Sequence, residues 1–213
     1  MDYSKTDGKK LLDYYRNEIE KNPLLEQCLI DGCDFFFDDE TDVNRDILIC
    51  GEESNYDLFP FAVAGDGSNY VLLNNEYVGY ISSEGDCGII AKNVNDFYNL
   101  LFVCKNVAIY FRYGYFDNID KFKENYDCAN DFANKKVKDS KIFDEFVSKH
   151  NFKTNIESIY EMFMEGIIIE PSFILQADPK EYEPWGDIFG TNQTYINELR
   201  NKSILYKGIK KWK

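Results

Sequence analysis

The side chains best suited to chemistry in this chain are its many carboxylates, its six cysteines and a single histidine. Because His150 is alone, H-E-x-x-H metalloproteases, zinc deaminases and histidine-rich nuclease sites are excluded. His150 follows a stretch with helical spacing, and a positive charge at a helix end favours the helix dipole. We therefore expect it to act as a capping or surface residue rather than as a catalytic base.

The densest acidic cluster begins at Asp38, and it does not fit a calcium loop. An EF-hand starting there would place Val43 where glycine is required and Ile49 where the bidentate glutamate belongs. Carboxylate pairs also hydrolyse glycosidic bonds, but the sequence singles out no pair. No metal and no cofactor are expected, and a glycosidase remains only a third possibility.

Motifs for nucleotide binding and acyl transfer are missing from the sequence. It holds no G-x-x-x-x-G-K-[ST] and no G-x-S-x-G. A G-x-G occurs at Gly65 and Gly67, but it lies between two strand-like runs and opens no helix that would receive a phosphate. We expect a turn there, and we expect the protein not to be an enzyme.

Cysteine use and hydropathy favour a reducing, cytoplasmic setting. The N-terminal MDYSKTDGKKLLDYY has no apolar signal core and no C-x-x-C occurs, so structural, reduced thiols are expected. The longest apolar runs fall far short of the roughly 18 to 20 residues that span a bilayer. The six cysteines are Cys28, Cys33, Cys50, Cys87, Cys104 and Cys128.

Charge is distributed unevenly along this chain of net charge −14. Residues 31–57 hold ten acids and one base, whereas residues 199–213 hold six bases and no acid. The acidic stretch would repel nucleic acid and attract a basic protein; the alternative is a solvated surface that only keeps the protein soluble. For the basic end, a frayed or docked terminus is favoured over a nucleic-acid arm.

Periodicity predicts helices first and then a strand meander. Residues 9–21 have helical spacing, a second short helix should stop near Gly32, and 33–37 and 46–50 read as strands. Residues 59–64, 69–73, 77–82 and 87–91 follow as strands joined by polar turns, with Asn74-Asn75 as a two-residue hairpin loop. A helix over 94–104 closes the meander.

The second half is expected to be mainly helical. Helical patterns cover 118–133, 140–150 and 154–164, with Gly166 as a stop, followed by an extended stretch over 167–176 and a short helix over 194–203. The fold class is thus α+β: an antiparallel meander of about five to six strands packed on helices. We expect a core over 1–104 with 105–213 packed on it, or one domain throughout.

The order of these elements resembles the SUKH superfamily, the fold of fungal cell-wall regulators and many bacterial immunity proteins. The resemblance rests on about 45 residues: Pro60 to Ala62, the GDG turn at 65–67, strands 70–73 and 77–81, and the helix at 97–101. It implies an immunity protein that neutralises a cognate toxin, often a nuclease with a basic cleft. The alternative is a scaffold or regulatory interaction module of the same fold without a toxin partner.

The acidic stretch and two neighbouring turns are the predicted partner-binding surface. Carboxylates there would meet cationic side chains, with aromatic anchors as hot spots. The partner is expected to be a toxin protein, and no nucleic acid or membrane is expected. The predicted partner-binding residues are Asp38, Asp39, Glu40, Asp42, Glu52, Glu53, Asp57, Asp66, Glu84 and Asp86.

Overall fold

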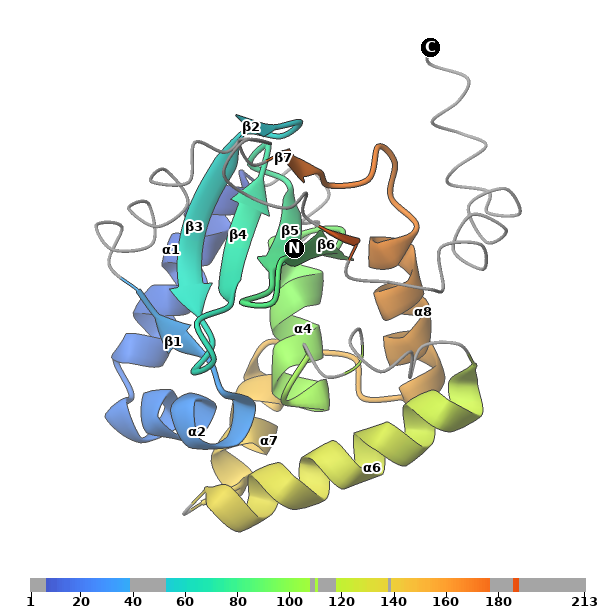
Figure 1. Ribbon diagram of the computed structural model, residues 1–213. Coiled ribbons are helices and arrows are strands. Elements are labelled where there is room, and N and C mark those ends of the chain that lie inside the picture. The colour runs from blue at the N-terminus through green and yellow to red at the C-terminus, as the bar shows by residue number, and fades with distance from the viewer. Residues whose placement is uncertain are drawn as a thin grey trace.

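The structure, a computed structural model, describes residues 7–38, 53–107, 110, 118–137, 139–176 and 186–187. It places a twisted sheet against a layer of helices (Figure 1). The helices are α1 (Gly8–Glu20), α2 (Pro23–Cys33), α4 (Val94–Cys104), α6 (Ile119–Lys136), α7 (Lys141–Lys149) and α8 (Ile156–Ile167). The strands are β1 (Phe36–Phe37), β2 (Glu53–Ser54), β3 (Leu58–Val63), β4 (Asn69–Leu73), β5 (Tyr77–Ile81), β6 (Asp86–Ala91), β7 (Leu175–Gln176) and β8 (Gly186–Asp187).

The expected meander is confirmed, and the fold is α+β. Strands β1, β3, β4, β5 and β6 are neighbours in that order, and each neighbouring pair is antiparallel. Strand β8 joins the sheet in parallel beside β6, and β2 and β7 form a separate two-stranded pair. These last two pairings join residues far apart in the chain, so local sequence patterns do not reveal them.

Two polar turns set the register of the meander. Asn74 and Asn75 have φ of 49° and 60°, which asparagine tolerates better than most residues, and the Glu76 amide donates to the Leu73 carbonyl over 3.0 Å. The loop includes Glu76 and is thus one residue longer than predicted, since Leu73 pairs with Tyr77. At the other end of β4, Gly67 takes a φ of 86° in the predicted G-x-G turn.

Most predicted helices are present, with two informative differences at their ends. Cys33 closes α2 and is not part of a strand; Asp34 then takes a left-handed conformation, and its carboxylate accepts the Gly65 amide at 3.0 Å. Gly166 does not stop α8, which continues through Ile167. The expected strand at 46–50 and the helix at 194–203 lie outside the described residues.

Both faces of the sheet are buried. On the helical face, Phe61, Tyr70 and Tyr80 pack with residues of α1, α4, α6, α7 and α8 in one continuous core. On the other face, Val71 and Ile89 pack against Phe173 and its neighbours. The helices after residue 104 therefore share their hydrophobic core with the meander.

The described cysteines are all free thiols. Cys28, Cys33, Cys87, Cys104 and Cys128 form no disulfide, and the first four are buried; Cys50 lies outside the described residues. Within the part of the chain that the structure describes, no helix is both long and apolar enough to cross a membrane.

Candidate functional site

The first turn of α1 is held against the β4–β5 turn by Asn75. The amides of Gly8 and Lys9 donate to the backbone oxygen and side-chain oxygen of Asn75 over 3.1 and 2.8 Å. The Asn75 side-chain amide donates in turn to Asp7, the N-cap of α1, over 2.9 Å. This hydrogen bond is the main reason that the pKa of Asp7 is lowered. One asparagine thus sets the spacing between helix and sheet.

Beside this contact lies an open groove of about 500 Å³, which we call the α1–β3 groove. Its apolar lining residues are Leu58, Phe59 and Leu72, and its other lining residues are polar. The Lys9 ammonium lies 4.0 Å from the centroid of the Phe59 ring. The polar lining residues are Asp7, Lys9, Lys10, Asp13, Asp57, Asn74 and Asn75.

A smaller recess of about 60 Å³ lies next to the groove, and Asp13 and Phe59 line both. Tyr98 lines the recess; its side chain is fully buried, and its hydroxyl has no hydrogen-bond partner among the described residues. Burial raises the pKa of Tyr98, so the hydroxyl stays neutral. The remaining residues of the recess are Leu12, Arg16, Phe37, Asp38, Pro60 and Phe61.

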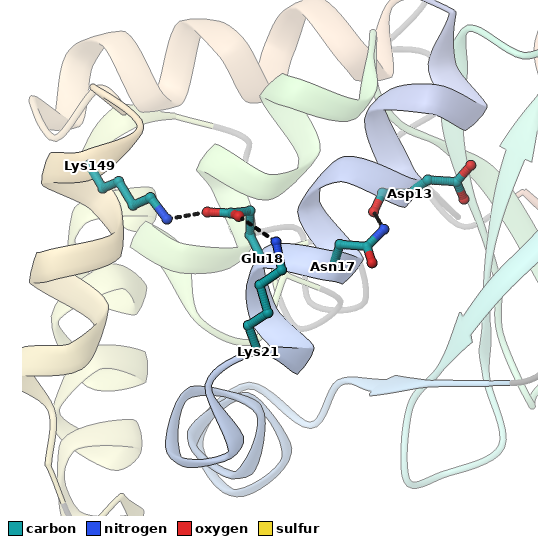
Figure 2. Close-up of polar contacts among 5 residues, drawn as sticks. All are labelled: Asp13, Asn17, Glu18, Lys21 and Lys149. Carbon is teal, nitrogen blue, oxygen red and sulfur yellow. Dashed lines mark hydrogen bonds and ion pairs between the residues drawn. The ribbon is translucent and has the colours of Figure 1, made fainter.

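The basic groups of the groove and recess make contacts within the chain. Lys10 pairs with Asp7 at 3.5 Å, and Arg16 pairs with Glu20 at 2.5 Å while lying 5.3 Å from the Phe37 ring. The exposed carboxylates of Asp13 and Asp57, by contrast, form no ion pair with any described residue. Figure 2 shows the Asp13 carboxylate pointing away from the Glu18–Lys149 ion pair, while its backbone oxygen accepts from Asn17.

The predicted acidic residues are divided between two ends of the sheet. Asp57 lines the groove next to Asn74, and Asp38 lines the recess. The other three with described side chains, Asp66, Glu84 and Asp86, lie at the opposite end of β4 and β5, where the Ser83 amide donates to the Ser68 hydroxyl over 3.0 Å. Glu53 pairs through its backbone in β2, and Asp39, Glu40, Asp42 and Glu52 lie outside the described residues.

No protein-family model matches the chain, and no curated protein or solved structure is significantly similar to it.

His150 corrects one expectation. It caps the C-terminus of α7 as predicted, but it is not a favourable site for a positive charge, because burial lowers the pKa of its imidazole. Its ring centroid lies 4.2 Å from that of Phe146 and 5.2 Å from that of Tyr15, and Nε2 has no partner in the described part of the chain. His150 is an element of an aromatic cluster.

Two other polar clusters have structural explanations. Glu18 of α1 pairs with Lys149 of α7 and, at 3.3 Å, with Lys21, so it joins two helices (Figure 2). Asp96 and Asn93 exchange hydrogen bonds of 2.8 and 2.9 Å at the start of α4, which is a reciprocal helix cap. Among the described residues, no group of three or more histidine, cysteine or acidic side chains could hold a metal ion.

Among the described residues, Lys105 is the only buried basic side chain, and its contacts are also part of the folded core. Its Nζ donates to the Phe102 carbonyl over 2.6 Å and lies 3.8 Å from the centroid of the Phe143 ring. Burial lowers the pKa of this ammonium. Its backbone has a φ of 65°, a conformation unusual for a residue other than glycine.

Sequence reasoning missed Asp13, Phe59 and Tyr98 as site residues. Asp13 lies on the polar side of an amphipathic helix, where a charge needs no special explanation. Phe59 and Tyr98 read as ordinary core residues. The sequence signal for the groove was the pair Asp7 and Asn75. Asp7 is a typical helix-capping residue and Asn75 a typical turn residue, and their side chains can join the helix to the turn by a hydrogen bond.

Proposed function

We propose that the protein is a non-enzymatic immunity protein that binds and neutralises a cognate bacterial toxin, and that the α1–β3 groove is part of its binding surface. The observation that carries the proposal is the groove itself, whose lining combines apolar residues, the aromatic Phe59 among them, with the exposed Asp13 and Asp57. Such a surface suits a partner with cationic side chains.

The net charge of −14 supports the same kind of partner. A field of one sign raises the rate at which an oppositely charged protein meets the surface, and it does so most strongly at low salt. The α+β order of a strand meander closed by a helix agrees with the fold that the SUKH resemblance implies.

The environment of the groove carboxylates favours binding over glycosidase chemistry. A catalytic acid of that type needs burial in apolar surroundings to hold its proton near neutral pH. Asp13 and Asp57 are exposed, so they are better placed to meet the charges of a partner than to donate a proton to a leaving group.

The test is co-expression with a toxin gene that neighbours this one. Cells that express the toxin alone should lose viability, and co-expression should restore it and allow the two proteins to be purified together. Survival without this protein, or death despite its soluble expression, would contradict the proposal. Absence of a toxin gene beside this one would instead favour the scaffold or regulatory alternative.

A further inference from the structure

Resting on the function proposed above, we propose that the α1–β3 groove receives an extended basic segment of the toxin. In this arrangement the aliphatic stems of lysine or arginine side chains cover the half-buried Leu58 and Phe59, and their head groups pair with Asp13 and Asp57. Long basic side chains suit such a groove because they combine an apolar stem with a charged end.

The charged groups of the groove favour a basic over an acidic segment. Lys9, Lys10 and Arg16 already contact Phe59, Asp7 and Glu20 respectively. Two groove carboxylates form no ion pair with a described residue: Asp13, which is in α1, and Asp57, which directly precedes β3. An acidic segment would meet both of these like charges, whereas a basic segment would pair with them.

The recess supplies a second, independent observation. The buried Tyr98 hydroxyl has no hydrogen-bond partner among the described residues, and a buried polar group left in that state costs free energy. A cationic head group in the recess would lie near the carboxylate of Asp38. A shift of the Tyr98 side chain, whose hydroxyl is enclosed in the free protein, would let that oxygen accept a hydrogen bond from the head group. The recess, at about 60 Å³, is far smaller than the groove at about 500 Å³, so it suits a head group rather than a whole side chain.

The shape of the two cavities favours an extended segment. Groove and recess share Asp13 and Phe59, and together they follow β3 from Leu58 to Phe61. At about 3.3 Å per residue, three or four extended residues span this length, and every second side chain points to the same side. A segment with basic residues at alternate positions would therefore reach both the groove and the recess.

The first experiment measures binding of a labelled eight-residue peptide of alternating lysine and valine to the full-length protein by fluorescence anisotropy. The expected result is that Asp13→Asn with Asp57→Asn weakens binding at least tenfold. The matched control, Glu124→Gln with Asp127→Asn, removes the same charge from two exposed positions of α6 and should stay within twofold of wild type. A peptide of alternating glutamate and valine should not bind.

Three results would overturn the inference. Equal weakening by both double variants would mean that only net charge matters. Binding of the glutamate peptide as tight as that of the lysine peptide would remove the assigned sign. Spermidine that binds the groove more tightly than the lysine peptide would make it a polyamine site rather than a docking site for protein.

Tyr98→Phe tests the recess separately from folding. Because the hydroxyl has no described partner in the free protein, its removal should leave the unfolding midpoint in urea unchanged or raised. Affinity for the lysine peptide should nevertheless fall at least threefold. Unchanged affinity in a folded variant would show that the recess takes no part.

The outcomes for this inference and for the proposed function are distinguishable. If the Asp13 and Asp57 double variant protects cells from the toxin as well as wild type does, the groove assignment fails while the function stands. If the lysine peptide binds the groove but no toxin is neutralised, the function fails while the chemistry of the groove stands.

Discussion

Replacing Gly8 by alanine should separate the first turn of α1 from the β4–β5 turn. A Cβ at position 8 would lie 2.5 Å from the Asn75 carbonyl oxygen and 2.9 Å from its carbon, both of them backbone atoms that cannot rotate away. Contacts of a real Cβ start near 3.0 Å, so α1 must retreat by about 0.5 Å. The hydrogen bond from the Gly8 amide, now 3.1 Å, would then be stretched beyond the usual limit.

The expected loss of stability combines two costs and one gain. Overpacking against backbone costs about 1–3 kcal/mol, and the weakened hydrogen bond about 1 kcal/mol more. Alanine returns at most about 1 kcal/mol through its higher helix propensity. Gly8→Ala should therefore lower the free energy of unfolding by about 1–3 kcal/mol.

The assay is urea unfolding followed by circular dichroism, with affinity for the lysine–valine peptide as a second measurement. Lys10→Ala, an exposed change in the same helical turn, is the control and should stay within about 0.5 kcal/mol of wild type. A Gly8→Ala protein as stable as wild type would refute the close approach of helix and turn on which the groove depends.

Three further predictions concern ionisable groups, each measured by urea unfolding at several pH values. Hydrogen bonding from Lys149 lowers the pKa of Glu18, so Glu18→Gln should lower the free energy of unfolding by up to about 1 kcal/mol at pH 7. This difference from wild type should vanish as pH falls from the ordinary glutamate pKa of 4.5 through the lower pKa of Glu18 in the folded protein. A difference that does not change with pH would contradict the ion pair. Burial lowers the pKa of His150, so the unfolded chain binds the proton at a higher pH than the folded protein does. Wild type should therefore lose stability as pH falls below 6.5, and His150→Phe should lack this loss. Parallel pH profiles of the two proteins would contradict the burial of His150. Burial also lowers the pKa of Lys105, so wild type should gain stability relative to Lys105→Met as pH rises towards 10.5, and a pH-independent difference would show that the ammonium is not desolvated.

The meander could be predicted because its signals are local. Asn74-Asn75 and the G-x-G at 65–67 are turn residues, and the apolar runs between them have strand length. The end of α8 could not be predicted in this way. Gly166 reads as a helix stop, but its missing side chain serves packing: a Cβ there would lie 2.9 Å from backbone atoms of Ile90 and Ala91 in β6.

The candidate site was harder to predict, because it depends on contacts between distant residues. Asp57 and Asp66 are close in sequence, yet the six residues of β3 lie between them, and at about 3.3 Å per residue this strand separates them by about 20 Å. Nothing near Asp13 indicates that α1 will lie beside β3. That arrangement follows from Asn75, whose partners Gly8 and Lys9 precede it by more than sixty residues.

The contact between Gly8 and Asn75 also fixes when the groove becomes available during synthesis. A ribosome adds about 5–20 residues per second, so α1 leaves the tunnel several seconds before the turn that holds it. Until then its apolar face, with Leu11 and Ile19, has no sheet to cover. The nascent chain thus acquires its binding surface only after the hairpin has formed, and a truncated product that ends before Asn75 would lack the groove.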